Sequence, residues 1–360
     1  MRDVLRLTQF CVGCEMLRDS FGRVIDYLRI SVTDRCNLRC VYCMPPQGIQ
    51  LKAHHEILTY EEITAVVRAA AALGIRKVRL TGGEPLVRPH VERLVEMVAA
   101  VPGIQDISLT TNAVLLDRHA GALSRAGLRR VNVSLDTLRA DRFGRITRFG
   151  NIADVWRGLE AAEREGLTPI KLNAVVVRGM NDDELADFAA LTQTHAWHVR
   201  FIELMPVSNE GDWGEHLPPP GDRLVTTEEM QARLSAHLGV PDLFSGALAL
   251  AVSGVAGNGP ARVFRLPAAL GTLGFISPVS QHFCPTCNRL RLTADGKLRP
   301  CLLANGEVDV IGALRNGASE RDVQTLLLRA VEHKPERHQL DEGLAPAQSI
   351  GPRVMAQIGG

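Results

Sequence analysis

From residue 27 onward, the hydrophobic pattern of the chain repeats one unit, a short strand followed by a helix. Apolar side chains alternate in each strand, and the segments between the strands show the helical period. Repeated strand–helix units predict a parallel sheet with right-handed crossovers. The predicted strands are Tyr27–Thr33, Lys77–Thr81, Gln105–Thr110, Arg130–Ser134, Lys171–Val177 and His198–Leu204.

Helical segments fill the intervals between these strands. Thr59 and Glu62 form a capping box at the start of the first helix, and Gly166 predicts the end of the fourth. A closed barrel of this kind needs eight strand–helix units. The six units seen here therefore predict an α/β fold that is an open, partial TIM-type barrel. The predicted helices are Thr59–Leu73, His90–Val101, Asp117–Ala126, Asp154–Glu165 and Asp182–Gln193.

The predicted strands have two different faces, because side chains alternate across a strand. One face is apolar throughout, as in Leu28 and Ile30 of the first strand, and we expect it to pack on the helices. A parallel sheet buried on both faces would read as continuous apolar runs. We therefore interpret the second face as a polar, basic lumen that binds a ligand, although solvent at the strand ends would account for single members. That face carries Arg29, Ser31, Thr33, Lys77, Arg79, Thr81, Ser108, Thr110, Asn132, Ser134, Lys171 and Asn173.

Beyond residue 205 the periodicity weakens. Pro218–Gly221 interrupts the chain, and residues 254–260 are rich in glycine. We expect a helix at Thr226–Leu238 and strands near Arg262–Leu266 and Leu273–Ser277. The chain is predicted to divide into an N-terminal extension (1–22), a barrel (23–205), a C-terminal extension with its own cysteines (206–345) and a Gly-Gly tail (346–360).

Composition narrows the class of protein. The net charge of +1 gives no overall attraction to nucleic acid or to a membrane surface, so an anionic ligand must meet local clusters of Arg and Lys. No segment approaches the ~18 consecutive apolar residues of a membrane span. The first residues also lack the pattern of a signal peptide. We expect a cytoplasmic protein that binds neither nucleic acid nor membranes.

The chain contains eight cysteines, which indicate a more specific chemistry. Thiols stay reduced in the cytoplasm, so ligation is a better account of them than disulfides. Cys36, Cys40 and Cys43 form a C-x3-C-x2-C triplet just after the first strand. Three thiolates hold a cubic iron–sulfur cluster with one iron left open. Zinc prefers four ligands with C-x2-C pairs and fits this triplet poorly, even with His54 and His55 downstream.

A second triplet, Cys284, Cys287 and Cys301, has the spacing C-x2-C-x13-C. Taken alone, it leaves open two interpretations: an iron–sulfur cluster with an open iron, or a zinc site completed by His282. Its coexistence with the first triplet favours a second [4Fe-4S] cluster, whose open iron would hold a substrate atom.

Glycines also follow the second predicted strand, in the run Thr81-Gly82-Gly83-Glu84-Pro85. Glycine lets backbone groups approach a ligand closely, and parallel α/β folds bind ligands at the carboxyl ends of their strands. Ser134 and Met205 occupy the corresponding positions after the fourth and sixth strands. These residues are therefore candidates for one ligand site.

The first triplet, with Tyr42 before its last cysteine, resembles the motif of the radical S-adenosylmethionine (SAM) enzymes. The Gly-Gly-Glu-Pro run resembles the motif with which that superfamily contacts the SAM amino group. The resemblance implies that SAM chelates the open iron and is reductively cleaved to methionine and a 5′-deoxyadenosyl radical. The cofactor then carries the difficult step, while the protein orients the reactants.

From about Phe21 to Gly360 the chain is similar to one family of that superfamily, the GTP 3′,8-cyclases of molybdenum cofactor biosynthesis (the MoaA family). Besides the two triplets, the most specific similarities are Phe21-Gly22-Arg23, Asn288-Arg289-Leu290-Arg291 and the terminal Gly359-Gly360. The pair Cys11 and Cys14 lies outside the family pattern. We expect the extension that carries it to have no essential role, although a redox or metal pair stays open.

The family resemblance implies a role for each matching residue. The SAM cluster would be held by Cys36, Cys40 and Cys43, and the SAM site would be lined by Tyr42, Gly83, Ser134 and Met205. A second cluster, which binds the purine of GTP, would be held by Cys284, Cys287 and Cys301. The residues that would contact GTP are Arg29, Arg79, Thr110, Lys171, Arg289, Leu290 and Arg291, with Lys77 and Arg200 as further candidates, and the tail that would reach into the active site is Gly359 and Gly360.

The implied reaction begins with abstraction of the ribose C3′ hydrogen of GTP. The C3′ radical adds to C8 of guanine, and reduction and protonation give 3′,8-cyclo-7,8-dihydro-GTP. The resemblance also implies an electron donor, transfer of the product to the next enzyme of molybdopterin synthesis, and a monomer or homodimer. Two alternatives stay open: a radical SAM maturase that acts on a peptide, and a zinc-stabilised binding module.

Overall fold

The computed structural model describes residues 16–205, 213, 218–244, 250–251, 259–338 and 353–359. Cys11, Cys14, Gly360 and most of the glycine-rich stretch at 254–260 lie outside the described residues. No helix in these ranges is long and apolar enough to cross a bilayer.

The described strands form one 12-stranded sheet with the order β12-β11-β10-β1-β2-β3-β4-β5-β6-β9-β8-β7. Because this order is linear, the sheet is an open barrel, as predicted. The six predicted strands are confirmed and pair in parallel from one to the next. They are β1 (Tyr27–Ser31), β2 (Lys77–Thr81), β3 (Asp106–Thr111), β4 (Arg130–Ser134), β5 (Lys171–Val176) and β6 (His198–Glu203).

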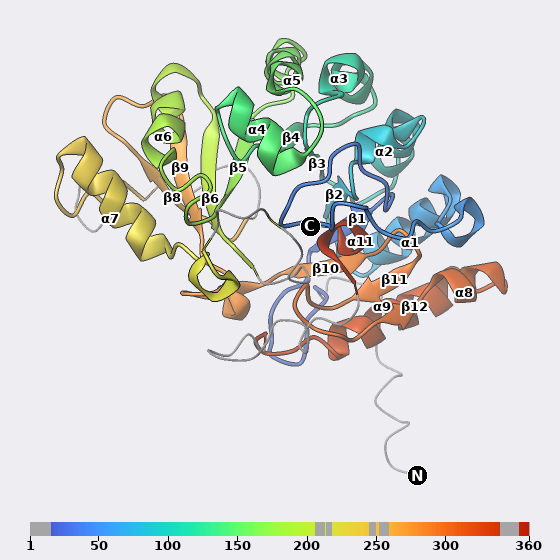
Figure 1. Cartoon of the computed structure of the whole chain (residues 1–360). Coiled ribbons are helices and arrows are strands. Elements are labelled where there is room, and N and C mark those ends of the chain that lie inside the picture. The colour runs from blue at the N-terminus through green and yellow to red at the C-terminus, as the bar shows by residue number, and fades with distance from the viewer. Residues whose placement is uncertain are drawn as a thin grey trace.

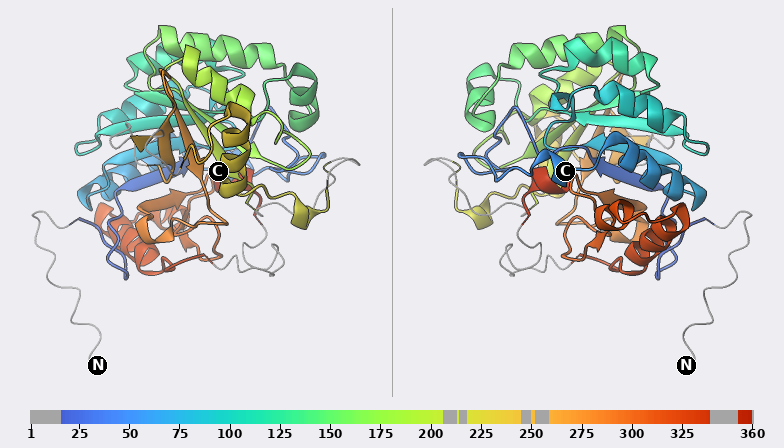
Figure 2. Two further views of the ribbon diagram at one scale, coloured as in Figure 1. Left: turned by 90° about the vertical axis from the view of Figure 1, so that its left-hand side faces the viewer. Right: turned by 90° about the vertical axis from the view of Figure 1, so that its right-hand side faces the viewer.

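The last third of the chain adds a parallel strand to each side of this core. β10 pairs with β1, and β9 pairs with β6, both in parallel. In Figures 1 and 2 the orange β10 lies beside the blue first strand, and in Figure 1 the orange β9 lies beside the yellow-green β6. The added strands are β7 (Leu250–Ala251), β8 (Arg262–Arg265), β9 (Thr272–Ile276), β10 (Arg289–Leu292), β11 (Lys297–Arg299) and β12 (Val308–Asp309), of which the sequence analysis predicted β8 and β9.

Helices cover the outside of the curved sheet, whereas the short α11 lies on its inner side (Figure 1). The capping box predicted at α1 is present, since the Glu62 backbone N–H donates to Thr59 Oγ1 and the Thr59 N–H donates to Glu62 Oε2. The helices are α1 (Tyr60–Ala72), α2 (Val91–Ala99), α3 (Leu116–Arg125), α4 (Ala140–Thr147), α5 (Ile152–Arg164), α6 (Leu185–Thr194), α7 (Thr227–Leu238), α8 (Ile311–Arg315), α9 (Glu320–Glu332) and α11 (Met355–Ile358).

The apolar strand face predicted from the sequence forms the core beneath these helices. Leu28, Leu80 and Val133 are fully buried there. Burial of each such side chain contributes about 1.5–3 kcal/mol to folding. The opposite face of the same strands is left for polar groups, as the alternation predicted.

Candidate active site

A cavity of about 290 Å³ lies on the inner face of the sheet, and both cysteine triplets contribute to its lining. Side chains at the carboxyl halves of the parallel strands complete it. The topology therefore brings together two motifs that are far apart in the sequence. The predicted residues that line the cavity are Arg29, Cys36, Cys40, Tyr42, Cys43, Arg79, Gly83, Thr110, Ser134, Arg200, Met205, Cys284, Cys287, Arg289, Arg291 and Cys301.

Three residues that were predicted to contact GTP lie elsewhere. Lys171 is buried on the same face of β5 as the cavity-lining Asn173, but two residues nearer the start of the strand, so it lies beneath the cavity. The Lys77 ammonium forms an ion pair with Asp26 at 2.8 Å. The side chain of Leu290 is fully buried in the core on the other face of β10. Only its backbone is available to a ligand in the cavity.

Arginines hold the backbone of the first cysteine loop. Arg39 Nη1 donates to the carbonyl of Cys36 at 2.8 Å, and Arg148 Nη1 donates to the carbonyl of Arg39 at 2.8 Å. Burial is the main cause that raises the pKa of Cys36 to about 11 and that of Cys43 to about 12. Thiolates in this loop therefore need the positive charge of a metal, which the irons of a cluster provide.

The second cysteine loop is held by residues from both ends of the chain. Arg23 Nη1 donates to the carbonyl of Cys284 at 2.8 Å, which explains the Phe-Gly-Arg motif ahead of the first strand. Lys334 Nζ donates to the carbonyl of Arg289 at 2.9 Å. Burial raises the pKa of Cys287, but the charges of Arg289 and Lys334 outweigh burial and lower it to about 6. This loop is electropositive and suits a thiolate ligand.

The positions of the cysteine side chains help to distinguish a zinc site from an iron–sulfur cluster. Within the described ranges, no three His, Cys, Asp or Glu side chains converge on a point where one metal ion could be held. His282 stacks edge-on against His338, with ring centroids 5.6 Å apart. In a cubic cluster each cysteine binds a different iron, whereas the ligands of zinc surround one ion. The arrangement of both triplets fits clusters better than single zinc ions.

The loop after β2 is shaped for close backbone approach. A side chain at Gly83 would place its Cβ 2.3 Å from the carbonyl oxygen of Arg35, so only glycine fits there. The Glu84 carboxylate accepts hydrogen bonds from the Thr111 hydroxyl and the Asn112 backbone N–H, both at 2.7 Å. Burial raises the pKa of Glu84 to about 7. Glu84 thus ties the loop after β2 to the end of β3.

Tyr42 is held in place by Asp136, two residues beyond the end of β4. Its hydroxyl donates to Asp136 Oδ2 at 2.7 Å, and the Val175 backbone N–H donates to Asp136 Oδ1 at 2.9 Å. Burial raises the pKa of Asp136 to about 6. The carboxylate therefore links the first cysteine loop to the ends of β4 and β5, next to Ser134.

Buried cations gather at the base of the cavity. Burial, followed by repulsion from neighbouring arginines, lowers the pKa of Arg200 to about 9 and that of Arg291 to about 10. The same causes hold the pKa of Arg29 well below its ordinary value. Buried like charges are stable together only when an anion neutralises them. The cluster therefore fits a multiply charged anion such as a phosphate chain.

The comparisons with known proteins agree with this site. Residues 30–192 match the Radical SAM superfamily, and residues 197–340 match Molybdenum Cofactor Synthesis C. The chain is 50% identical over 347 residues to the GTP 3′,8-cyclase of Moorella thermoacetica, covering 96% of this chain and 100% of that one. It is 51% identical over 346 residues to the GTP 3′,8-cyclase of Pelotomaculum thermopropionicum, with the same coverage of 96% and 100%. The chain belongs to the GTP 3′,8-cyclase family.

Solved structures support the fold of this GTP 3′,8-cyclase family member. SuiB of Streptococcus suis bound to S-adenosylmethionine superposes with a TM-score of 0.56 at 12% identity, over 89% of this chain and 78% of that one. The AdoMet-bound anSMEcpe gives 0.54 at 16%, over 87% and 78%. Membership of the radical SAM superfamily implies a [4Fe-4S] cluster and SAM, and the donors of the first cysteine loop fit them.

Sequence reasoning missed several cavity residues of this family member. Asp136 lies two residues after β4, and Asn112 lies one residue after β3. Because parallel folds bind ligands at the carboxyl ends of their strands, both positions could have been predicted. Lys334 lies just beyond α9, and its sequence surroundings carry no comparable signal. Its place beside the second triplet arises only from the packing of the C-terminal elements.

Proposed function

We propose that the protein is a lyase that converts GTP to (8S)-3′,8-cyclo-7,8-dihydroguanosine 5′-triphosphate, the first step of molybdenum cofactor biosynthesis. The observation that carries this proposal is a single cavity lined by two cysteine triplets and a cluster of buried arginines. We infer that the chain divides into a barrel, which carries the first triplet, and a C-terminal extension, which carries the second. Each part thereby supplies half of the site.

The side of the cavity formed by the barrel would bind SAM. Cys36, Cys40 and Cys43 hold the first [4Fe-4S] cluster, and Tyr42, Gly83, Ser134 and Met205 surround SAM. When bound, the cluster and SAM supply a 5′-deoxyadenosyl radical that removes the C3′ hydrogen of GTP. Asp136 keeps Tyr42 in place, and Glu84 keeps the glycine loop in place, so that SAM has one orientation.

GTP would lie between SAM and the second cysteine loop. Cys284, Cys287 and Cys301 hold a second [4Fe-4S] cluster whose open iron takes the purine. Arg29, Arg79, Arg200 and Arg291 neutralise the triphosphate, with Lys171 beneath them. The buried Thr110 hydroxyl lacks a hydrogen-bond partner within the described ranges and lines the cavity, which supports a polar ligand contact there.

The Gly-Gly tail would complete the site. The carbonyl of Gly359 accepts a hydrogen bond from Arg291 Nη1 at 2.7 Å, so the tail touches a residue assigned to GTP. Gly359 is buried and has a φ of 79°. This contact supports a tail that orients the substrate, with Gly360 beyond it.

The proposal also includes an external electron donor and delivery of the product to the next enzyme of molybdopterin synthesis. It places a monomer or homodimer in the cytoplasm. The peptide-maturase alternative shares the fold, and likeness to SuiB therefore does not decide between the two. Curated relatives that match nearly the whole chain are named GTP 3′,8-cyclase, which favours the nucleotide.

The test of the function is anaerobic incubation of the reduced protein, with both clusters reconstituted, with SAM and GTP. We expect a cyclised nucleotide and one 5′-deoxyadenosine per turnover. Formation of 5′-deoxyadenosine without any new nucleotide would favour the peptide alternative. A protein that binds zinc and no iron would instead indicate the binding module.

Arg291→Ala should weaken GTP binding ~10- to ~100-fold, because a buried charge-assisted hydrogen bond is lost. The iron content should not change, since Arg291 is not a ligand. Anaerobic equilibrium dialysis with labelled GTP measures the affinity. Arg315→Ala is the control, because Arg315 forms its ion pair with Glu62 away from the cavity lining. An unchanged Kd for Arg291→Ala would remove this residue from the GTP site.

GTP affinity should also depend on the charge of Lys171. Burial, followed by repulsion from Arg200 and Arg130, lowers the pKa of Lys171 to about 7, so its ammonium is charged below that pH. A bound triphosphate stabilises the ammonium, and binding above pH 7 must therefore take up a proton. Between pH 6.5 and 8.5 the affinity should fall ~3- to ~10-fold more in the wild type than in Lys171→Met. Parallel pH profiles for the two proteins would contradict this assignment.

A further inference from the structure

An arginine just before α11 attaches the C-terminal segment, residues 353–359, to the turn between β10 and β11 and to the loop before β12. Arg353 donates to both oxygens of Asp295, at 3.0 and 2.9 Å. It also pairs with Glu307, whose Oε1 lies 2.7 Å from Arg353 Nε. The side chains of Arg353 and Asp295 are only 17% and 12% exposed. These are partly buried, bidentate ion pairs, which are the strong kind.

The two carboxylates are themselves held in place. The Thr293 hydroxyl donates to Asp295 Oδ1 at 2.6 Å, and Arg299 pairs with Glu307. Burial raises the pKa of Asp295, but hydrogen bonds from Arg353 and Thr293 outweigh burial and lower it overall. Asp295 therefore stays ionised, and the pair with Arg353 persists, at neutral pH.

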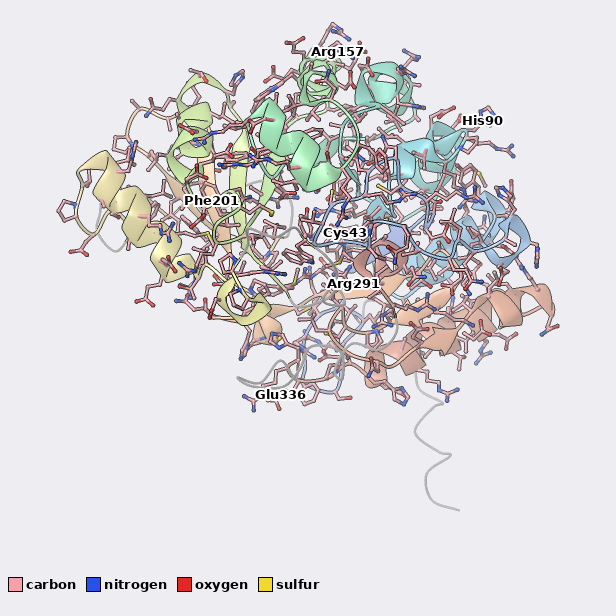
Figure 3. All side chains as sticks on the ribbon, in the orientation of Figure 1. Cys43, His90, Arg157, Phe201, Arg291 and Glu336 are labelled. Atoms are coloured by element: carbon pink, nitrogen blue, oxygen red, sulfur yellow. The ribbon has the colours of Figure 1, made fainter. Side chains whose placement is uncertain are left out.

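The segment beyond Arg353 touches both halves of the active site. Ala356 belongs to a buried apolar cluster against which Cys43 packs. Ile358 packs next to Cys301, and the Gly359 carbonyl accepts from Arg291. Figure 3 labels Cys43 and Arg291, the two residues between which the segment lies.

The secondary structure of the segment does little to hold it in this position. α11 has four residues, a single turn, and a helix of that length is not stable on its own. Its apolar contacts come from Val354, Ala356 and Ile358, which are buried, but such contacts are not directional. Within the described ranges, the ion pairs of Arg353 are the only ion pairs that attach the segment to the rest of the chain.

We propose that Arg353 is a positioning residue, whose ion pairs with Asp295 and Glu307 seat the C-terminal segment against Cys43 and Arg291. Through this contact Arg353 acts on turnover without touching substrate. The effect on turnover rests on the proposed function, whereas the effect on the segment does not.

Hydrogen exchange of the reconstituted full-length enzyme tests this proposal. The amides of Gln357 and Gly359 donate within the segment, to the carbonyls of Val354 and Met355. In Arg353→Ala, we expect the peptide that spans these amides to exchange at least ~10-fold faster. We also expect kcat for the cyclised nucleotide to fall at least ~10-fold, with the iron content and the KM for SAM unchanged.

Arg233 offers a matched control. It pairs with Asp182 and Glu229, and Glu229 is shared with Arg178, just as Glu307 is shared between Arg353 and Arg299. Arg233→Ala removes an equivalent network on α7 and should leave exchange in the segment and kcat unchanged. Arg353→Lys, which keeps the charge but loses the planar fork, should give intermediate exchange.

The outcomes separate the proposal from the function. Unchanged exchange in Arg353→Ala would overturn the positioning role. If Arg353→Ala fails to fold, Asp295→Asn serves instead, because it removes the same ion pair by changing the carboxylate. Unchanged hydrogen exchange of the segment in Asp295→Asn would also overturn the positioning role. If the wild type makes no cyclised nucleotide, the proposed function fails, while the exchange rates still decide the role of Arg353.

Discussion

Cys287→Ala should abolish formation of the cyclised nucleotide, the largest effect that a single substitution is expected to have here. Two remaining thiolates hold a cubic cluster too weakly, so iron should fall from about eight atoms per chain to about four. GTP would lose the open iron that holds its purine. The first triplet lies in a separate loop after β1, so reductive cleavage of SAM to 5′-deoxyadenosine should continue without coupling to GTP.

Iron and acid-labile sulfide analysis, together with chromatography of the nucleotides, measures this result. Cys14→Ala is the matched control, because it also removes one thiol but is expected to change neither iron nor product. Retention of about eight irons by Cys287→Ala, or product at the wild-type rate, would contradict the assignment of the second triplet to a cluster.

Gly359→Ala should lower turnover at least ~100-fold while both clusters remain. A Cβ at this position would lie 2.9 Å from Ser31 Cβ and 2.9 Å from Thr81 Cγ2, two atoms of the strand face beside the cavity. The φ of 79° adds strain of about 1–2 kcal/mol for any residue with a Cβ. The tail would then leave Arg291, and GTP would lose a contact that orients it.

Gly166→Ala separates backbone strain from the loss of the tail contact. Gly166 has a φ of 72°, and a Cβ there meets nothing within 4 Å. Both variants should lose a similar few degrees of Tm, but only Gly359→Ala should lose turnover. Equal turnover in the two variants would show that the close approach of the tail has no part in catalysis.

The sequence predicted the barrel well because its signals are local. Alternation marked β1 to β6, and Thr59 with Glu62 marked the start of α1. Arg289-Leu290-Arg291-Leu292 carries the same alternation, yet it was interpreted as part of a cysteine motif rather than as β10. Recognising that strand would have placed Leu290 in the core, opposite the two arginines.

The rest depends on contacts that no local pattern contains. β10 joins β1, and α9 packs beside α1, across most of the length of the chain. Those pairings put Lys334 beside the second triplet and Arg353 beside Asp295. Strand alternation predicted which residues make up the basic lumen. It did not predict that Lys171 lies beneath the cavity, because the depth of a residue follows from the tilt and pairing of neighbouring strands.

We propose that one cavity holds C3′ of GTP against the first cysteine loop, while the second loop holds the purine. GTP deuterated at C3′, turned over anaerobically with SAM, tests this claim most directly by mass spectrometry of the products. We expect one deuterium in 5′-deoxyadenosine and none at C3′ of the cyclised nucleotide. Unlabelled 5′-deoxyadenosine formed alongside that nucleotide would contradict it.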